Sequence, residues 1–497
     1  MQEKWLLVYE IIYVIVVVLV CLRVIYDTRS TTKTIAYMLL VIFLPIAGIF
    51  IYFSFGINYR KRKIYNKKIV KDNKLDEQIH AEIVHYTLHN LERKNPAIAA
   101  NKELAHLLLK DGSSPLTANN NVKLLVNGEQ KFPEVLKALE EAKHHIHIEY
   151  YIYEDDEIGR AIEQILIRKA QEGVIVRFIY DDFGSRTIRK KMVRRLRDAG
   201  AKAYAFHKII FIALANRLNY RNHRKIIVID GVVGFVGGIN VSDRYINTPD
   251  SKSSGIKPGG KNKNLYWRDT HLRIEGPGVH YLQYLFLADW NFCANETATL
   301  TNDLFPKEHP FMPRGNKLVQ MAASGPDSDR PTILFSLLQA IYLAQEEILI
   351  TTPYFIPGES ILEALIVSAL SGLKVKLLVP GVSDSKFVNT AARSYYAELL
   401  KAGVEIYRYQ KGFVHAKTMV TDSKVAIVGS ANMDYRSFDL NFEVNAIVYD
   451  QEIASELRTI FYEDLKGAEQ IDPVRWEARP WYYELTEKTA RLVAPML

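Results

Sequence analysis

Two stretches of the sequence carry the same three polar residue types at the same spacing, and these types suit chemistry at a phosphate. A lysine follows a histidine by two residues, and an aspartate follows that histidine by seven. The residues are His223, Lys225 and Asp230 in the first stretch, and His415, Lys417 and Asp422 in the second. An imidazole can attack phosphorus or transfer a proton, and an ammonium group stabilises negative charge. One stretch alone also fits a structural histidine, but two in register predict one shared site.

The residues around each motif explain how its side chains reach such a site. In a strand, residues two apart point to the same face, so each histidine projects beside its lysine. The apolar run 226–229 continues the first strand, and the aspartate lies in the turn beyond it. A glycine-containing turn follows in each copy and ends at Asn240 or Asn432. Such a turn brings backbone N–H groups close to a phosphate, with the asparagine as a further donor.

The chain that leads to each motif is also built twice, with a period of about 190 residues. Each copy contains a helical pattern, an apolar strand, a second helix, a second apolar strand and a leucine-rich helix that ends at glycine. We expect the strands at 146–151 and 174–180 in the first copy, and at 348–354 and 375–379 in the second. Strands that alternate with helices predict an α/β fold, here a duplicated domain with two mixed, mostly parallel sheets flanked by helices.

Two apolar runs precede the repeats. Residues 5–26 are nearly all apolar, and residues 34–55 contain no charged side chain. Each run has about 22 residues, and about 20 are enough to cross a bilayer, so a transmembrane hairpin is predicted. The basic cluster 60–63 outweighs the two basic residues of the turn between the runs, which places both termini and the catalytic part in the cytoplasm. We expect four parts: the hairpin at 1–58, a basic and helical connector at 59–115, a first repeat at 116–314, and a second repeat with a tail at 315–497.

Composition limits the remaining choices. The net charge of +8, from 64 Lys and Arg against 56 Asp and Glu, suits an anionic membrane, an anionic substrate or a nucleic acid about equally. Cys21 and Cys293 are the only cysteines, so neither a disulfide framework nor a thiolate metal site is expected. The acidic pairs 155–156 and 181–182 are ordinary at loop starts. We therefore expect no metal and no cofactor.

Taken together, the two motifs resemble those of the phospholipase D superfamily, and the likeness covers nearly the whole chain. Several segments are also similar to bacterial cardiolipin synthases: Leu44-Pro45, Phe55-Gly56, Trp267-Arg268-Asp269, Ser324-Gly325-Pro326-Asp327, Arg479-Pro480-Trp481 and Ala494-Pro495-Met496-Leu497. The resemblance implies that the two motifs meet at a pseudo-two-fold axis and form one active site. It also implies a multi-pass protein of the bacterial cytoplasmic membrane, with phosphatidylglycerol and other anionic lipids as its partners.

The resemblance further implies a role for each site residue. His223 would be the nucleophile that forms a phosphohistidine, and His415 the acid and base, although the sequence alone does not decide between them. In the superfamily a carboxylate from the opposite copy orients each histidine, which here gives Glu443 for His223 and Asp269 for His415. The aspartates Asp230 and Asp422 belong to the catalytic motifs but suit stabilising a turn better than touching substrate. The supporting set comprises Asn240, Asn432, Ser430, Glu443 and Asp269.

Three activities compete for this site. The first is transfer of a phosphatidyl group between two phosphatidylglycerol molecules, which gives cardiolipin and glycerol. The second is either phospholipase D hydrolysis, with water as the acceptor, or phosphatidyl transfer to another alcohol. The third is a nuclease. The apolar runs disfavour it, because DNA cleavage does not require membrane spans, and its signature of aromatic residues interleaved with a basic groove is not seen. No nucleic acid partner is therefore expected. The acceptor alcohol and the oligomeric state stay open. The apolar segment 209–214 is either interfacial or core, and the loop 248–264 is expected to be a solvated linker.

Overall fold

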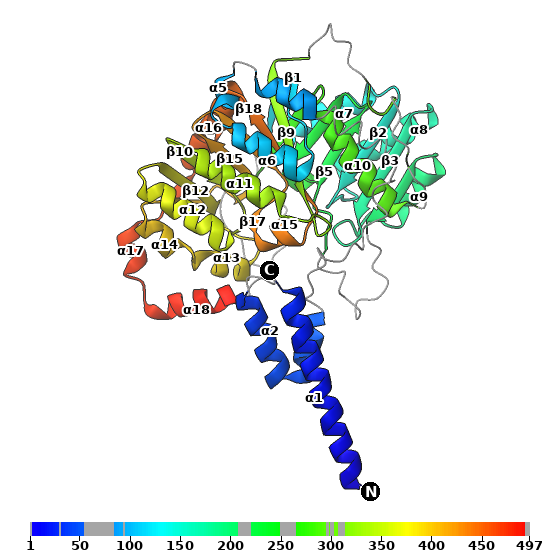
Figure 1. Ribbon diagram of the computed structural model, residues 1–497. Coiled ribbons are helices and arrows are strands. Elements are labelled where there is room, and N and C mark those ends of the chain that lie inside the picture. Colours follow the sequence, from blue (N-terminus) through cyan, green and yellow to red (C-terminus); the bar gives the residue numbers. More distant parts are fainter. Residues whose placement is uncertain are drawn as a thin grey trace. The chain divides into compact units, whose positions relative to one another are not determined.

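The computed structural model describes residues 2–28, 31–53, 84–92, 95–206, 220–248, 265–294, 298, 303–306 and 314–492 (Figure 1). Four features singled out in the sequence lie outside these described residues: the basic cluster 60–63, the segment 209–214, nearly all of the loop 248–264 and the tail 494–497. The chain forms two compact units. The first holds the N-terminal residues and the second holds both motifs, and each is described by itself.

The second unit is built on one fifteen-stranded mixed sheet whose two halves repeat the same strand order. The first half contains β1 Thr117–Val126, β2 His145–Tyr150, β3 Ile175–Asp181, β4 Lys202–Phe206, β5 Lys225–Ile229, β6 Val233–Gly237 and β8 Thr270–Glu275. The second contains β9 Lys317–Ser324, β10 Glu347–Thr351, β12 Lys374–Pro380, β13 Glu405–Tyr409, β15 Thr418–Thr421, β16 Val425–Gly429, β18 Glu443–Tyr449 and β19 Ala468–Gln470. The halves meet where β1 pairs with β9 in antiparallel orientation.

Helices cover both faces of this sheet (Figure 1). On one face, three helices pack their apolar sides on the first half and three on the second: α7 Asn127–Glu140, α8 Glu157–Gln171, α9 Lys191–Asp198, α6 Lys102–Gly112, α11 Thr332–Leu343 and α12 Gly358–Leu370. The other face is covered by α10 Val279–Cys293 and α16 Gln451–Leu465, whose buried side chains share one cluster. Because each strand alternates its side chains between the faces, both faces need such a cover.

The duplicated α/β fold predicted from the sequence is present, but its sheet differs from the prediction. The strands expected at 146–151 and 174–180 occur as β2 and β3 and pair in parallel. The halves form one sheet rather than two, because joining β1 to β9 gives both strands a partner where separate sheets would each leave an open edge. Most neighbouring strands are antiparallel, since a short turn such as that between β5 and β6 can join only antiparallel strands.

Among the described residues of the first unit, one helix is long enough to cross a membrane. Helix α1 spans Gln2–Asp27, and its residues 8–27 are apolar enough for a bilayer crossing. The second apolar run is not one helix, because α2 ends at Phe43 and α3 runs over Pro45–Ile51. Pro45 lacks a backbone N–H and disfavours helical backbone at the residue before it, so Leu44 takes an extended φ of −132° and the helix breaks there.

After the break, α3 turns back along α2. A Cβ on Gly48 would lie 2.4 Å from the carbonyl oxygen of Leu40, so the two backbones are in direct contact. The hydroxyl of Tyr52 then donates to the carbonyl of Arg23, at 3.3 Å, near the end of α1. Helices of 13 and 7 residues reach about 20 Å and about 10 Å, short of the roughly 30 Å hydrocarbon core. The second span of the predicted hairpin is therefore corrected to a folded-back helix pair.

Candidate active site

Each motif is joined through its main chain to the opposite half of the sheet. The backbone N–H of His223 donates to the carbonyl of Phe442 at 2.9 Å, and the N–H of His415 donates to the carbonyl of Arg268 at 2.7 Å. Phe442 directly precedes Glu443, and Arg268 directly precedes Asp269. Each histidine is therefore fixed beside a carboxylate residue of the opposite half of the sheet.

These main-chain bonds bring each imidazole against the carboxylate that the resemblance assigns to it. Nδ1 of His223 lies 2.8 and 3.0 Å from the two carboxylate oxygens of Glu443. Nδ1 of His415 lies 2.7 Å from Oδ2 of Asp269. Both carboxylates are fully buried, whereas each imidazole keeps about a tenth of its surface exposed. A carboxylate on Nδ1 fixes the proton there, so Nε2 is left to attack or to exchange a proton.

The two motif lysines are buried beside the histidines. Nζ of Lys225 donates to the carbonyl of His223 at 2.6 Å, and Nζ of Lys417 donates to the carbonyl of His415. Burial lowers the pKa of Lys225 to about 7 and that of Lys417 to about 8, although nearby carboxylates favour the charged forms. The charge of Lys417 also lowers the pKa of Lys225, which places the two ammonium groups in one electrostatic site.

Burial and the lysines decide the charge of the histidines. Burial lowers the pKa of His223 below its usual value, and burial with the neighbouring Lys417 lowers the pKa of His415 to about 3. Burial alone would raise the pKa of Glu443 and of Asp269, but their histidines and the motif lysines hold both pKa values below the ordinary range. At neutral pH the site therefore holds neutral imidazoles, ionised carboxylates, a mostly positive Lys417 and a partly positive Lys225.

The glycine-containing turns differ between the halves in step with the carboxylates. In the second half the hydroxyl of Ser430 donates to Oε2 of Glu443 at 2.5 Å. In the first half the equivalent residue is Gly238, where a Cβ would lie 2.2 Å from Oδ1 of Asp269. The shorter aspartate thus occupies the space that the serine side chain fills in the other copy. Ser430, a predicted supporting residue, contacts the carboxylate of its histidine–carboxylate pair, and each such pair is called a dyad below.

The motif aspartates lie away from the histidines. The carboxylate of Asp230 accepts three backbone N–H groups from residues 143–145 at 2.8–2.9 Å, where β2 begins. Asp422 accepts three from residues 345–347 at 2.8–3.0 Å, where β10 begins. These contacts lie at the far ends of β5 and β15 from the histidines. Asp230 and Asp422 therefore hold these strand starts, and their inclusion among the catalytic groups stays a prediction.

The two asparagines hold loops in the unliganded site. Asn240 accepts from the backbone N–H of Ile152 at 3.2 Å and donates to the hydroxyl of Tyr245 at 2.7 Å. Asn432 donates to Oδ2 of Asp434 at 3.1 Å. Both side chains are buried. Each amide NH2 has a second N–H, so the predicted donation to a phosphate does not require either asparagine to give up its present partner.

Two buried arginines contact the main chain of the dyad carboxylates, and the sequence did not predict the acidic residues with which they pair. Arg224 pairs with the buried carboxylate of Asp289 on α10 and donates to the carbonyl of Glu443 at 3.4 Å. Arg268 binds both carboxylate oxygens of Asp464 on α16, at 2.8 and 2.9 Å, and donates to the carbonyl of Asp269 at 2.6 Å. Each guanidinium therefore holds the main chain of one dyad carboxylate.

The two arginines come from different positions of the repeat. Arg224 directly follows the motif histidine, where the second copy has Ala416. Arg268 directly precedes the dyad carboxylate, where the other copy has Phe442, and the guanidinium of Arg224 lies 5.6 Å from that phenyl ring. The His223 dyad therefore has Arg224 beside Phe442, whereas the His415 dyad has Ala416 at the first position and Arg268 at the second.

Aromatic side chains line the imidazoles. The ring centre of Tyr151 lies 4.8 Å from that of His223. The ring centres of Trp267, Phe413 and Tyr245 lie 5.6–6.0 Å from that of His415. The two histidines thus have unlike surroundings, with a larger aromatic wall on the His415 side. Two of these aromatic residues could have been found from the sequence, because Phe413 lies two residues before His415 and Trp267 lies two residues before Asp269.

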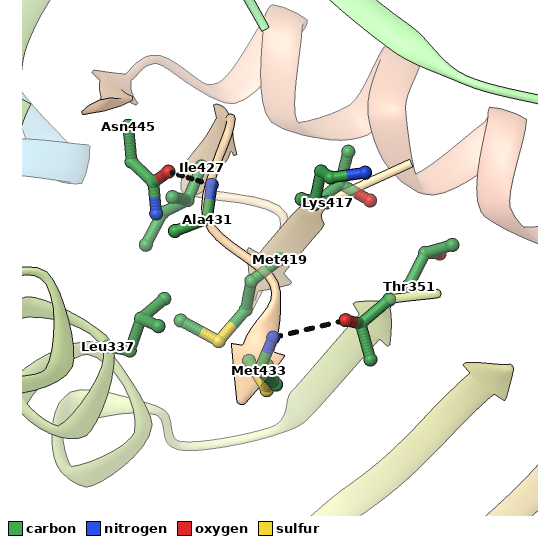
Figure 2. A pocket seen from close by; sticks show the side chains of 10 residues that line it. Leu337, Thr351, Lys417, Met419, Ile427, Ala431, Met433 and Asn445 are labelled. Atoms are coloured by element: carbon green, nitrogen blue, oxygen red, sulfur yellow. Dashed lines mark hydrogen bonds between the residues drawn. The ribbon is translucent and has the colours of Figure 1, made fainter. Parts of the chain in front are cut away.

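The space behind the motif turns is also unlike in the two halves. Behind Lys417 a small hollow is lined by Leu337, Met419, Met433 and Ala431, the third residue of its turn (Figure 2). Behind the first turn, Nζ of the fully buried Lys131 donates to the carbonyl of Ile239, the equivalent third residue, at 2.7 Å. Burial lowers the pKa of Lys131 well below its ordinary value. In the second turn the N–H of Ala431 donates instead to Oδ1 of Asn445 at 3.3 Å, so the two turns are held by different polar side chains.

The described part of the chain contains no group of three or more His, Cys, Asp or Glu side chains arranged to hold a metal ion. One aspartate of each acidic pair noted in the sequence accepts hydrogen bonds from backbone N–H groups. Asp156 accepts from the N–H of Gly159 at the start of α8, and Asp181 accepts from the N–H groups of Phe183 and Gly184.

Comparison with known proteins identifies the class. A family model described as "Cardiolipin synthase, PLD-like domain" matches residues 135–250 and 337–465. A second, described as "Phospholipase_D-nuclease N-terminal", matches residues 11–56. The first model covers both motifs and the second covers the apolar N-terminal helices. The fold and the paired motifs are those of a phospholipase D-like protein.

Relatives over the full length narrow the family. The chain is 39% identical over 492 residues to a cardiolipin synthase of Alkalihalophilus pseudofirmus, with 98% of this chain and 93% of the relative covered. It is 38% identical to the major cardiolipin synthase of Bacillus subtilis, with 98% of both chains covered. The crystal structure of a Haemophilus influenzae phosphatidylserine synthase shares the fold, with a TM-score of 0.58, 13% identity, and 80% of this chain and 100% of that chain covered. The chain belongs to the cardiolipin synthase family, which confirms the resemblance.

Proposed function

We propose that the chain transfers a phosphatidyl group from one phosphatidylglycerol to another and releases glycerol. The observation that carries this is the pair of crossed dyads, His223 with Glu443 and His415 with Asp269, beside two buried lysines. Two imidazoles at one phosphate suit a two-step displacement, in which one attacks and the other transfers protons. The family relationship supplies the lipid substrate, because the relatives over the full length are cardiolipin synthases.

In the first step, Nε2 of His223 attacks phosphorus of the first phosphatidylglycerol. The N–P bond forms as the bond from phosphorus to the glycerol headgroup oxygen breaks, and that oxygen takes a proton from Nε2 of His415. In the second step, a headgroup hydroxyl of the second phosphatidylglycerol attacks phosphorus and returns its proton to His415. The N–P bond breaks, and cardiolipin leaves. Lys225 and Lys417 stabilise the charge on the phosphoryl oxygens in both steps.

The protonation states follow from the unliganded site. A neutral His223 is the form that can attack phosphorus. His415 must carry a proton to act as the acid, whereas its pKa is lowered to about 3 by burial and by the charge of Lys417. A bound phosphodiester brings a negative charge beside the lysines and His415, which favours the protonated imidazole. Substrate binding therefore prepares the acid that the unliganded site lacks.

The membrane arrangement is revised from that predicted by sequence alone. We propose that α1 crosses the bilayer once and that α2 and α3 enter and return on the side where α1 ends. All basic residues between Arg23 and Lys68 then share one side with the catalytic part, which the positive-inside rule assigns to the cytoplasm. The N-terminus lies on the opposite side, instead of in the cytoplasm.

Product analysis tests the proposed function. The full-length enzyme, purified in detergent and supplied with phosphatidylglycerol and a chelator but no nucleotide, should release cardiolipin and glycerol in equal amounts. One phosphodiester is exchanged for another, so no activated donor is required, and excess glycerol should drive the reaction backwards. Phosphatidic acid as the main product would favour hydrolysis, and dependence on a CDP-linked lipid would contradict the proposal.

A further inference from the structure

Helix α18, over Trp481–Leu492, is fixed to the second half of the sheet by its polar side. Its buried Glu487 accepts from Nη1 of Arg479 at 2.8 Å and lies 3.2 Å from Nε of Arg393 on helix α13, which spans Lys386–Arg393. Ala490 is buried on the same side. The helix is therefore held in one rotation about its axis.

The opposite side of α18 exposes large apolar side chains. Trp481, Leu485 and Leu492 are 72%, 55% and 82% exposed, and Tyr482 is 51% exposed. At 100° per residue, the first three fall within one narrow stripe, turned away from Glu487 and Ala490. A helix on a soluble surface normally shows the reverse pattern, with its apolar stripe inward. An exposed apolar stripe of this kind marks an interaction site, here with the Lys488–Glu484 ion pair along one edge.

This face borders the end of the sheet that carries the active site. Helix α13 begins two residues after Asp384, which accepts from the hydroxyl of Tyr354 at 2.6 Å and whose charge raises the pKa of Lys417 against the effect of burial. Phe387, on the first turn of α13, is 46% exposed. Figure 1 shows α13 and α18 together at the lower end of the second half. Exposed apolar side chains thus lie on both helices, on α13 beside the Asp384 loop and on α18, which packs against α13.

We propose that α18 lies in the headgroup layer of the bilayer and places the mouth of the active site against the lipid surface. Tryptophan and tyrosine are the residues that this layer favours, because each has an apolar ring with a polar N–H or O–H that stays hydrated. The inference deepens the proposed function, since substrates that are bilayer lipids must reach the histidines from a membrane surface. A second copy of the chain or a protein partner on this face is the alternative outcome of the test.

Lipid-borne quenchers test the placement directly. The full-length enzyme is reconstituted into vesicles of phosphatidylglycerol and bromine-labelled phosphatidylcholine, and its tryptophan emission is compared with that of Trp481→Phe. The difference isolates Trp481 from the four other tryptophans. Quenching should be stronger with bromine near the headgroups than with bromine near the chain ends. Emission from Trp481 that neither lipid quenches would overturn the proposal and favour a protein on this face.

Kinetics supply the second readout. Trp481→Ser combined with Leu485→Ser should raise the KM for phosphatidylglycerol in vesicles about tenfold, equivalent to about 1.4 kcal/mol. The kcat with a short-chain, monomeric phosphatidylglycerol should not change. The matched control is Val367→Ser with Leu370→Ser, which removes two exposed apolar side chains from α12 and should leave both values unchanged.

The two readouts separate this inference from the proposed function. An unchanged KM in vesicles for the α18 variant would overturn the placement of α18 while the enzyme still makes cardiolipin. A wild-type enzyme that makes no cardiolipin from either form of the lipid would remove the proposed function. The quenching measurement needs no turnover, so it would still decide whether α18 lies in the headgroup layer.

Discussion

The carboxylate of Glu443, in the second half of the sheet, lies 2.8 Å from Nδ1 of His223, in the first half. Asp269 and His415 form the reverse pair, at 2.7 Å. Neither half therefore contains a complete histidine–carboxylate pair. The two imidazoles also differ in their surroundings, because Ser430 supports Glu443 while Gly238 leaves room for Asp269.

The crossed pairs predict different defects for the two carboxylates. Glu443→Gln should slow formation of the phosphohistidine by about a hundredfold or more, because the amide no longer fixes the His223 proton on Nδ1. Asp269→Asn should slow proton transfer by His415. Acid-labile label from ³²P-phosphatidylglycerol, followed by rapid quenching, separates the two effects. Glu477→Gln, at an exposed carboxylate, is the control, and equal loss of label in both dyad variants would contradict the division of roles.

The arginines predict a rescue. Arg268→Phe should lower kcat/KM by about tenfold to a hundredfold and lower the melting temperature, because the partly buried Asp464 loses its partner. Adding Ala416→Arg to that variant recreates the Arg-with-Phe arrangement of the other dyad and should recover part of both losses. Ala416→Lys is the matched control, since an ammonium group cannot bind a carboxylate and a carbonyl in the same planar geometry. A double variant no better than Arg268→Phe would contradict the equivalence of the two sites.

The lysines predict the alkaline limit of activity. Their pKa values, lowered by burial to about 7 for Lys225 and about 8 for Lys417, mean that raising pH through this range removes the positive charge that binds phosphate. The profile of kcat/KM should therefore fall between about pH 7 and pH 8. The profile of kcat should fall at higher pH, because a bound phosphodiester favours the ammonium forms. Coincident alkaline limbs would show that the lysines do not set this limit.

The folded-back helices predict where the N-terminus lies. A single crossing by α1 places a reporter fused before Gln2 outside the cytoplasm, and one inserted between α1 and α2 inside it. A cysteine placed at residue 44 should stay protected from membrane-impermeant thiol reagents added to either side, since α2 and α3 turn within the bilayer. The natural Cys21 and Cys293 are replaced by Ser for this measurement. A reporter between α1 and α2 that reads outside the cytoplasm would restore the two-span hairpin, since that arrangement places this turn on the outer side.

The motif pairs could be predicted because their signals are short and repeated. A histidine and a lysine two residues apart on a strand share one face in any sheet, and the duplication placed them at equivalent positions. The partner carboxylates followed from the resemblance, since the residues before them, Phe442 and Arg268, carry no spacing rule of their own. Catalytic roles for all these residues stay predictions until the variants are measured.

Other features had no local signal or had one that competed with a stronger one. Asp289 lies in a mostly apolar helix 65 residues after Arg224, and only the folded chain makes them neighbours. The joining of β1 to β9 depends on edges that no periodicity marks. Pro45 was visible in the second apolar run, but run length measures only apolar content and passes over a residue that ends a helix.

The continuous sheet has a consequence for how this site can change over evolutionary time. In a symmetric dimer of separate single-motif chains, every substitution would enter both halves of the shared site at once. With both copies on one polypeptide, equivalent positions can carry different residues, such as Arg224 and Ala416, or Gly238 and Ser430. A change in one copy is then not imposed on the other. Covalent linkage thus lets one histidine become specialised for attack and the other for proton transfer by independent mutations.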